Sequence, residues 1–391
     1  MSQTVIDHSP DLKRLQNEGY SLFAQDGYLV IDDIPYLNSG KEVVTGRLIT
    51  AYTQAGSKAV CSDHIVFFDG ETPHDIEGRA LNQIINGVSE NVHSNSIKSR
   101  MRFSSKPDTG YKDIHHKMTS YIEMLAGPAR VLDPSSTPRK YKAIPQNTDN
   151  SPFVYSDTNA SRAGVQSISQ KLSGQRIGII GLGGTGSYIL DFVAKTPVTE
   201  IRLIDGDEYY AHNAFRSPSA ASIDELNAGM KKVVYHQQKY SKLHRGITIH
   251  PCYLSKETMD LLDGLDFVFI AIDQGSVKAD IFAYLDLKGI PHIDVGMGVE
   301  ITPSNTLRGA IRTTAFTNPS RLGLRRFINL KDDDDAIYSS NIQICELNAF
   351  NAVLAVVAWK RHMNFYHESV LVGQTSFNID TMGLIGVDHE S

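Results

Sequence analysis

A glycine-rich loop between a predicted strand and a predicted helix constrains the fold of this chain more than any other feature. The strand is expected at Arg176–Ile180 and the helix at Ser187–Lys195. The loop between them follows a GxGxxG spacing, with glycines at Gly181, Gly183, Gly184 and Gly186. Glycines at this spacing allow a tight turn and a close approach of the backbone to a phosphate, and the N–H groups at the helix N-terminus favour an anion. The loop therefore predicts a nucleotide site.

The C-terminal part of the chain alternates between strand-like and helix-like segments. After the glycine loop we expect strands at Glu200–Asp205, Ile247–Tyr253, Asp266–Ile272 and His292–Val295, and helices at Met230–Leu243, Val277–Leu287 and Ile342–Met363. This order is typical of a mostly parallel sheet with helices on both faces. We therefore predict a Rossmann-like α/β fold for this part.

The N-terminal part has a different pattern. The segments Gly27–Ile34 and His64–Phe68 are rich in β-forming residues, and Ile114–Ala126 has apolar residues at helical spacing, so we expect a small α+β domain. Four prolines lie close together between the two parts, at Pro134, Pro138, Pro145 and Pro152. They mark a linker. We predict a domain at 1–132, a linker at 133–160 and a second domain at 161–391.

Composition excludes several classes of protein. The chain has 391 residues, of which 41% are hydrophobic, and its net charge is −6. A mildly acidic chain is a poor candidate for nucleic-acid binding, which needs a basic surface. The N-terminus has no signal-peptide core, and no apolar run reaches the roughly 18 residues of a membrane span. We expect a cytoplasmic protein that binds neither nucleic acid nor a membrane.

The cysteines are too few and too far apart for a disulfide scaffold. The chain has three, Cys61, Cys252 and Cys345. No two form a CxxC pair, so a cysteine-based zinc site is not expected.

Charged residues after the glycine loop narrow the class of nucleotide. Asp205 ends the next strand, 24 residues after Gly181, where a ribose hydroxyl would be held. An NAD site is the default interpretation of these two features. However, Asp207, Asn213 and Arg216 follow, and Lys232 and Asp273 come later. In an NAD site, Asn213, Arg216, Lys232 and Asp273 would have no role.

Taken together, these motifs resemble the adenylation domain of the ThiF/MoeB/HesA family, which includes the ubiquitin-activating enzymes. The family pattern is GxGGxG(S/C), then DxDxxxxxNxxR, then GxxK, then a strand that ends in D(N/Q). The chain carries all four elements in order, from Gly181 to Asp273-Gln274. The resemblance covers roughly residues 160–380.

The resemblance implies an activity and a set of site residues. Members of the family join the C-terminal carboxylate of a protein to the α-phosphate of ATP, and pyrophosphate leaves. Asp207 would hold the ribose with support from Asp205, and Asp273 would bind Mg²⁺. Phosphate-binding roles would fall to Asn213, Arg216 and Lys232, and Lys278 and Arg162 are further cations, the latter reaching into a partner subunit's site. The implied substrate is a ubiquitin-like or sulfur-carrier protein with a flexible tail, and the implied assembly is a homodimer.

The chain departs from the family pattern in its cysteines. Many members have a cysteine for a thioester in the loop before the last helix, but Thr313–Asn341 has none. We expect this loop to cover the incoming tail as a strap. Cys345 lies just beyond it and is the candidate for a thioester. A buried structural role on the helix is the favoured interpretation of Cys345.

Several alternatives stay open at this stage. The chain could be a catalytically incomplete adenylation-type subunit that binds a partner, or an NAD-dependent oxidoreductase. The acidic run Asp332–Asp335 is interpreted as a solvated loop. The N-terminal domain has scattered histidines without metal-ligand spacing, and it distantly resembles an uncharacterised extension ahead of ThiF-like modules in bacterial ubiquitin-like conjugation gene clusters. We interpret it as a binding module for the modifier or for a downstream conjugating enzyme.

Overall fold

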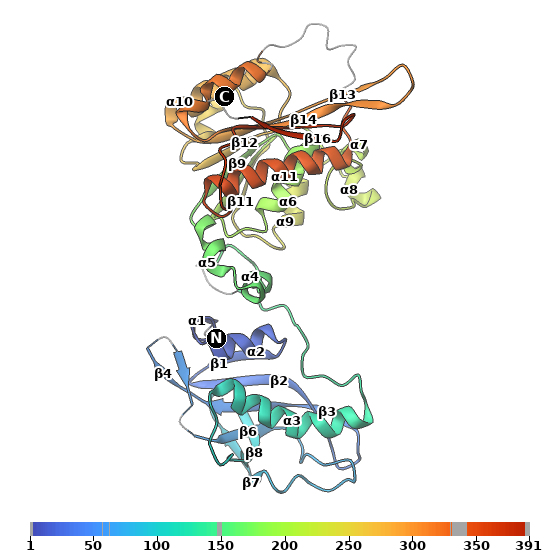
Figure 1. Ribbon diagram of the computed structural model, residues 1–391. Coiled ribbons are helices and arrows are strands. Elements are labelled where there is room, and N and C mark those ends of the chain that lie inside the picture. Colours follow the sequence, from blue (N-terminus) through green and yellow to red (C-terminus); the bar gives the residue numbers. More distant parts are fainter. Residues whose placement is uncertain are drawn as a thin grey trace. The chain divides into compact units, whose positions relative to one another are not determined.

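The computed structural model describes residues 3–56, 58–61, 63–146, 151–328, 330 and 342–387. The chain forms two compact units, Met1–Ile144 and Pro145–Ser391 (Figure 1). The acidic run Asp332–Asp335 lies outside the described residues, together with the rest of 331–341 and residue 329 of the expected strap. No helix within the described ranges is both long and apolar enough to cross a membrane.

The N-terminal unit is a small α+β domain, as expected. Its main sheet is antiparallel, with strand order β1-β2-β3-β6-β8-β7. The strands are β1 (Ser21–Gln25), β2 (Tyr28–Leu37), β3 (Val43–Ala51), β6 (Ile65–Asp69), β7 (Ile85–Val92) and β8 (Lys98–Ser104), with a separate pair β4 (Thr53–Ala55) and β5 (Lys58–Val60). The helices are α1 (Gln3–His8), α2 (Pro10–Asn17) and α3 (Ile114–Leu132).

Helix α3 packs on the sheet through the apolar face that the sequence predicts. Met118, Tyr121, Ile122 and Leu125 are fully buried in the core of this unit. The helix is longer than predicted, because it continues past Ala126 through Pro128 to Leu132.

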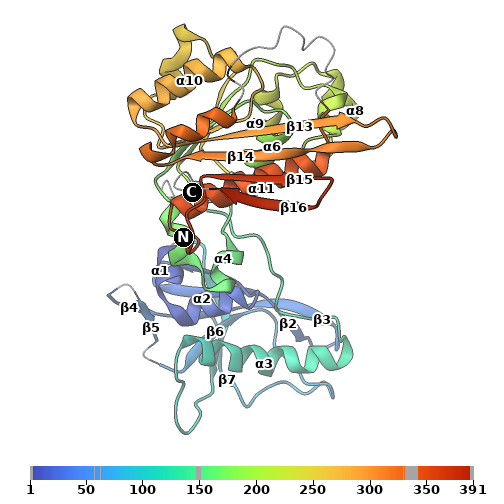
Figure 2. The same ribbon diagram turned by 45° about the horizontal axis from the view of Figure 1, so that its top comes forward.

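The C-terminal unit contains the predicted Rossmann-like sheet and an antiparallel extension. The strand order is β11-β10-β9-β12-β13-β14-β15-β16. The strands β11, β10, β9, β12 and β13 pair in parallel. The strands β13 to β16 pair antiparallel (Figure 2). The strands are β9 (Arg176–Ile180), β10 (Glu200–Ile204), β11 (Ile247–His250), β12 (Phe267–Ile270), β13 (His292–Ile301), β14 (Leu307–Phe316), β15 (Gln374–Asn378) and β16 (Gly383–Val387).

Helices cover both faces of this sheet, as predicted (Figure 1). On one face α6 (Gly184–Val193), α9 (Lys232–Tyr240) and α11 (Cys345–His362) pack on side chains such as Ile179 and Phe269. On the other face α10 (Gly275–Lys288) and the 3₁₀ helix η2 (Lys256–Leu262) pack on Ile180 and Ile270. Shorter helices are α4 (Thr158–Ala163), α5 (Gln166–Ser169), η1 (Gln170–Leu172), α7 (Ala211–Ala214), α8 (Ile223–Asn227) and η3 (Pro319–Phe327).

The predicted start of the loop Thr313–Asn341 is wrong. Thr313–Phe316 are the last residues of β14, and η3 follows. Thr313 and Thr314 are polar, but both are buried and hydrogen-bonded to side chains of α11 and β15. The sequence does not show these partners, which lie 38 and 60 residues away.

The parallel strands end level with one another and so fix the place of the site. Ile180 of β9 pairs with Ile204 of β10 and with Ile270 of β12. The segments that follow these strands therefore meet at one edge of the sheet, where α/β folds bind their ligands.

Candidate nucleotide site

The glycine loop has the close packing that its spacing predicts. Gly181 has a φ of +84°, and a Cβ on it would lie 2.5 Å from the carbonyl oxygen of Ala271. A Cβ on Gly186 would lie 1.9 Å from the carbonyl oxygen of Gly181. These two glycines let α6 begin directly against the ends of β9 and β12. Gly183, in contrast, has open space around its Cβ position, where a phosphate can approach.

Asp205 holds the glycine loop in place. Its two carboxylate oxygens accept hydrogen bonds from the backbone N–H groups of Leu182, at 2.6 Å, and Asp207, at 2.8 Å. The side chain is buried. Burial raises the pKa of Asp205, although Lys232 and the two backbone donors oppose that shift. Asp205 thus supports the glycine loop through both carboxylate oxygens.

Asp207 and Lys232 form an ion pair beside the loop. Lys232 Nζ lies 2.6 Å from Asp207 Oδ2 and 3.8 Å from Asp205 Oδ2. Asp207 also accepts a hydrogen bond from the hydroxyl of Tyr253. Partial burial opposes ionisation of Asp207, but Lys232 and Tyr253 outweigh it, so the pKa of Asp207 lies below its ordinary value. The hydrogen bond to Asp207 raises the pKa of Tyr253 to about 12.

A cavity of about 310 Å³ opens at this edge of the sheet. The predicted site residues that line it are Gly181, Gly183, Gly184, Asp205, Asp207, Arg216, Lys232, Asp273 and Lys278. They come from the ends of three strands and from helices on both faces. The fold therefore brings together most of the residues that the sequence predicts for one site.

Arg216 offers the cavity a buried cationic donor. Its Nε atom is buried and has no hydrogen-bond partner within the described part of the chain. Burial lowers the pKa of this guanidinium below its ordinary value, while the carboxylates of Asp273 and Asp207 favour the charged form. A guanidinium stays protonated under these conditions. Arg216 can therefore pair with an anion that enters the cavity.

Four of the predicted site residues do not line this cavity. Gly186 lies outside the cavity lining, where the absence of a side chain allows close packing against Gly181. The side-chain oxygen of Asn213 accepts a hydrogen bond from the backbone N–H of Tyr210 at the start of α7, and its Nδ2 atom has no partner among the described residues. Arg162 is exposed on α4, and Cys345 is the first residue of α11, with its Sγ 3.0 Å from the hydroxyl of Tyr188.

Sequence reasoning missed a buried charge cluster at the other end of the cavity. Asp294 on β13 is fully buried between two cations, with Lys278 Nζ at 2.8 Å and Arg312 Nη2 at 2.7 Å. Arg312 also donates to Thr314. An aspartate inside the apolar segment HIDV was the available signal, because a buried carboxylate needs a partner.

Two amide side chains also line the cavity. Asn348 on α11 accepts a hydrogen bond from Thr185 of the glycine loop at 2.8 Å. Its Nδ2 atom, and Oε1 of Gln343, are buried without partners in the described part of the structure. Both residues line the cavity, and neither was predicted.

A smaller cavity of about 180 Å³ adjoins the first one and shares Gly181, Asp205, Asp207, Ile272 and Asp273 with it. Its other lining residues are mostly apolar: Ile180, Ile204, Cys252, Tyr253, Leu254, Gln274 and Val277. An apolar slot of this shape can accept a planar group. Cys252 lies beyond the end of β11, not inside the strand as the sequence analysis expects.

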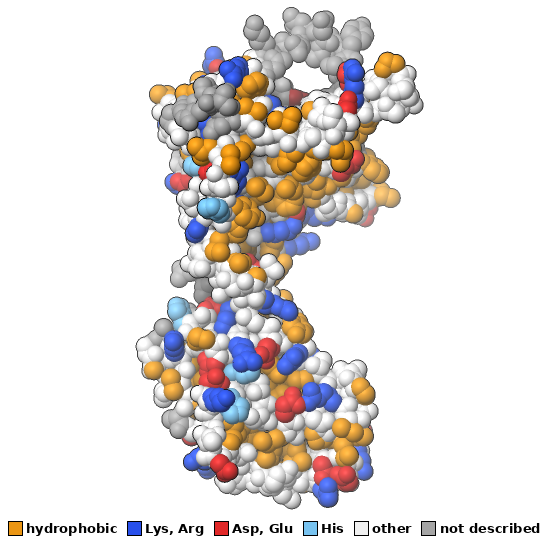
Figure 3. Space-filling model, viewed as in Figure 1, with side chains coloured by type: hydrophobic (Ala, Val, Ile, Leu, Met, Phe, Trp, Pro, Cys, Tyr) orange, Lys and Arg blue, Asp and Glu red, His pale blue; other side chains and the backbone are white. Residues whose placement is uncertain are grey.

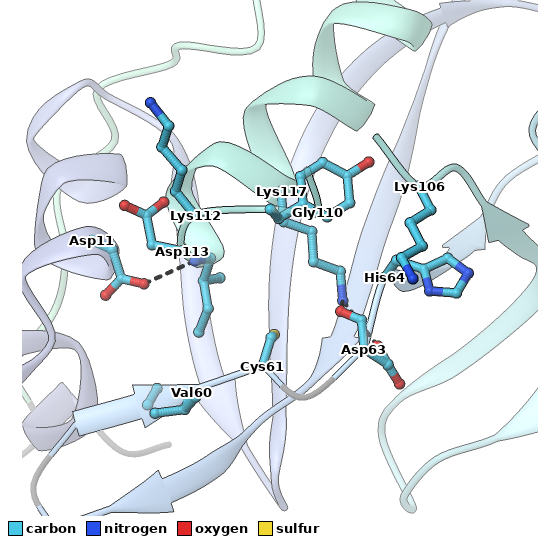
Figure 4. Close-up of a pocket in the computed structure, with 13 residues that line it drawn as sticks. Asp11, Val60, Cys61, Asp63, His64, Lys106, Gly110, Lys112, Asp113 and Lys117 are labelled. Carbon is cyan, nitrogen blue, oxygen red and sulfur yellow. Dashed lines mark hydrogen bonds and ion pairs between the residues drawn. The ribbon is translucent and has the colours of Figure 1, made fainter. Parts of the chain in front are cut away.

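The N-terminal unit has a cavity of its own, of about 400 Å³ (Figure 4). Lys117 of α3 is almost fully buried beside it and donates hydrogen bonds to Thr50 and Asp63 at 2.9 and 3.1 Å. The Cys61 thiol also lines it, and burial raises the pKa of Cys61, which favours the neutral thiol. The lining mixes three lysines with three aspartates, so its charge favours no one class of ligand.

The described residues contain no group of three or more His, Cys, Asp or Glu side chains that could hold a metal ion. A Mg²⁺ ion needs fewer protein ligands, because it is commonly held by one or two carboxylates together with nucleotide phosphates. Asp273, which lines the cavity beside the glycine loop, fits that requirement.

Comparison with known proteins agrees with this geometry. The model of the ThiF family matches residues 157–317, which contain the glycine loop and the carboxylates around it. Residues 157–317 are a ThiF family domain. Residues 10–158 match a domain of unknown function, DUF6791.

One curated relative is the tRNA threonylcarbamoyladenosine dehydratase of Haemophilus influenzae. It is 31% identical to this chain over 130 residues, which are 32% of this chain and 49% of that enzyme. The match thus spans about half the length of the relative.

Solved structures with partial similarity to the ThiF-containing chain include Escherichia coli MccB with ATP, with a TM-score of 0.44 and 15% identity over 59% of this chain and 69% of that one. Another is E. coli MccB with AMPCPP and MccA, which has a TM-score of 0.45 and 15% sequence identity over 63% of this chain and 73% of that one. The E. coli dehydratase TcdA in complex with AMP has a TM-score of 0.41 and 20% identity over 53% of this chain and 92% of that one.

Proposed function

We propose that the chain adenylates a carboxylate with ATP and Mg²⁺ and releases pyrophosphate. The substrate in this proposal is the C-terminal carboxylate of a ubiquitin-like or sulfur-carrier protein. The enzyme would be a ThiF-family adenylyltransferase of the modifier-activating type, in a bacterial pathway that conjugates a ubiquitin-like protein.

The buried, unpartnered Nε of Arg216 carries this proposal. It lies in a cavity whose floor is the glycine loop and whose walls include Lys232 and Asp273. A buried N–H donor without a hydrogen-bond partner is costly, and an anion in the cavity would accept from it and remove that cost. Triphosphate chemistry brings several negative charges together, so it requires cations held in place before the reaction.

The reaction would need positioning more than covalent chemistry. An oxygen of the carboxylate attacks the α-phosphorus of ATP, the bond from that phosphorus to the bridging oxygen breaks, and pyrophosphate leaves. Arg216 and Lys232 would pair with the phosphate oxygens, and Asp207 would bind the ribose. Mg²⁺, held by Asp273, would supply additional positive charge at the phosphates.

The nucleotide in the related structures supports ATP. MccB has been solved with ATP and TcdA with AMP, and the ThiF match includes the glycine loop. An NAD-dependent oxidoreductase would leave the cations of this cavity without a role. A catalytically incomplete subunit would bind ATP without turning it over.

We also propose that the enzyme is a homodimer. Hydrophobic side chains gather around α11 on one face of the C-terminal unit (Figure 3). Val353 and Val357 of α11 are 38% and 37% exposed, and Leu384 and Ile385 of β16 are 57% and 60% exposed. Exposed apolar groups of this kind mark association surfaces. Light scattering should give twice the chain mass, and Val357→Glu should shift it toward the monomer.

Isothermal titration calorimetry tests the nucleotide assignment. Wild-type protein should bind ATP with Mg²⁺ and should not bind NADH. Arg216→Gln and Lys232→Ala should weaken ATP binding by about tenfold or more, which is about 1.4 kcal/mol. Lys231→Ala is the matched control, because Lys231 is 42% exposed and donates to the Gly206 carbonyl, outside the cavity lining. Binding of NADH instead of ATP would contradict the proposal.

A further inference from the structure

We propose that Asn348 of helix α11 is a further nucleotide-binding residue, whose Nδ2 atom donates a hydrogen bond to the α-phosphate of the nucleotide. The inference rests on the proposed adenylation at the same site and deepens it. It adds a donor from a helix that none of the four sequence elements includes, because α11 begins at Cys345.

The amide of Asn348 lies against the glycine loop. Asn348 is 1% exposed and lines the cavity together with Gly183, Gly184 and Thr185. Its Nδ2 atom lies 2.1 Å from the place that a Cβ on Gly184 would occupy. This contact puts the amide at the N-terminus of α6, which begins at Gly184. The N–H groups at such a helix N-terminus favour a phosphate, so the amide and the phosphate would be neighbours.

This amide has one atom engaged in the protein and one without a partner. The hydroxyl of Thr185 donates a hydrogen bond to Oδ1 of Asn348 at 2.8 Å, which fixes the orientation of the amide. Nδ2 is buried and has no hydrogen-bond partner within the described part of the chain. A buried donor without a partner is destabilising. A phosphate oxygen is a strong acceptor and would satisfy it.

A second asparagine of α11 shows that the spare donor is particular to Asn348. Asn351 lies three residues further on, on the same side of the helix, and is also buried at the cavity wall. Its Oδ1 atom accepts a hydrogen bond from Thr313 at 2.9 Å, and its Nδ2 atom donates to the carbonyl of Gly296 at 3.0 Å. Asn351 therefore joins α11 to the sheet, whereas Asn348 keeps a donor for a ligand.

The order of the strands identifies the phosphate. Asp207, which is proposed to bind the ribose, follows β10, and the glycine loop follows β9. These strands are neighbours, about 4.8 Å apart. The α-phosphate is the one attached to the ribose, so it is the phosphate expected at the glycine loop beside Asn348. The carboxylate attacks this phosphorus, and a donor placed there would stabilise the negative charge of the transition state.

Isothermal titration calorimetry of the full chain with ATP and with AMP, both with Mg²⁺, tests the inference. Asn348→Asp keeps the shape of the side chain and the hydrogen bond from Thr185, but it replaces the unpartnered donor with a carboxylate oxygen. We expect this variant to bind ATP and AMP each about tenfold or more weakly than wild type does, because the carboxylate repels the α-phosphate that both ligands share. Asn227→Asp is the matched control and should stay within about twofold, because Asn227 is exposed at the end of α8, outside the cavity lining.

Asn348→Ala keeps the inference testable if the charged variant does not fold. It removes the donor without adding charge, so the affinity for both ligands should fall about threefold to tenfold, less than in Asn348→Asp. A purely structural role predicts the opposite order, because alanine also loses the hydrogen bond from Thr185.

The inference is overturned if either variant binds ATP as wild type does, or if Asn348→Ala loses more affinity than Asn348→Asp. It is also overturned if ATP affinity falls while AMP affinity does not, since the contact would then be to the β- or γ-phosphate. Absence of ATP binding to the wild type would instead contradict the proposed nucleotide function.

Discussion

The ammonium group of Lys232 lies 2.6 Å from the carboxylate of Asp207, on the wall of the cavity that contains the glycine loop. Lys232 would have to exchange this partner for phosphate oxygens when a nucleotide binds. Asp207→Asn removes the charge that holds Lys232 and the oxygen proposed for the ribose. We expect ATP affinity to fall about tenfold or more, measured by calorimetry. Glu208→Gln alters the neighbouring acid outside the cavity and should leave ATP affinity within twofold. Equal effects of the two variants would contradict the role of Asp207.

The glycines of the loop should differ sharply in their tolerance of alanine. A Cβ on Gly186 would lie 1.9 Å from the Gly181 carbonyl oxygen, which is backbone and cannot move aside. Gly186→Ala should lower the free energy of unfolding by about 1–3 kcal/mol or more. Gly183→Ala meets no atom within 4 Å and has a φ of −70°, so it should fold normally. Thermal unfolding of the two variants distinguishes them, and equal melting temperatures would show that the loop packs differently.

Buried His236 predicts a loss of stability in acid. Its side chain is 1% exposed, and burial, together with the charge of Lys232, lowers the pKa of His236 from 6.5 to about 3. Between these pH values the unfolded chain binds a proton at this site that the folded chain does not. Stability therefore rises with pH across this window and falls as pH drops below about 6.5.

The variant His236→Phe isolates this effect. It should reduce the pH dependence of the free energy of unfolding by about 1.4 kcal/mol per pH unit between pH 4 and 6. The measurement is urea unfolding at several pH values. Parallel curves for wild type and variant would show that His236 is not buried in its neutral form.

Cys345 should be dispensable for adenylation. Its thiol lies 3.0 Å from the hydroxyl of Tyr188, and burial with this contact raises the pKa of Tyr188 to about 12. The thiol does not line the proposed nucleotide cavity. Cys345→Ala should keep pyrophosphate exchange within twofold of wild type. A separate assay tests for a thioester. If the wild type forms a reductant-sensitive adduct with the substrate protein and Cys345→Ala does not, the thioester is on Cys345.

The fold brings together the residues that the sequence predicts for the nucleotide end of the site, because these residues follow strands in a fixed order. Gly181, Asp207 and Asp273 each follow a parallel strand, and parallel strands end at one edge of a sheet. Arg216 and Lys232 do not directly follow a strand, but the family pattern includes both, and both line the cavity.

The other end of the cavity depends on pairings that sequence patterns do not encode. Arg312 is one of several arginines, and only the register of β13 with β14 and the packing of α10 place it beside Asp294 and Lys278. The amides of Gln343 and Asn348 likewise gain significance only from their burial at the cavity wall. Thr313 and Thr314 look like the start of a polar loop but belong to β14, since tertiary hydrogen bonds satisfy them.

Exchange of labelled pyrophosphate into ATP tests the central claim most directly. The assay would use wild type, Asp273→Asn and the control Asp280→Asn, each with a panel of ubiquitin-like and sulfur-carrier proteins. Asp280 is on the adjacent helix α10 and does not line the cavity. We expect exchange that depends on one added protein, persists in Asp280→Asn and falls at least 100-fold in Asp273→Asn. ATP binding without exchange for any protein in the panel would contradict adenylation and would indicate a binding subunit.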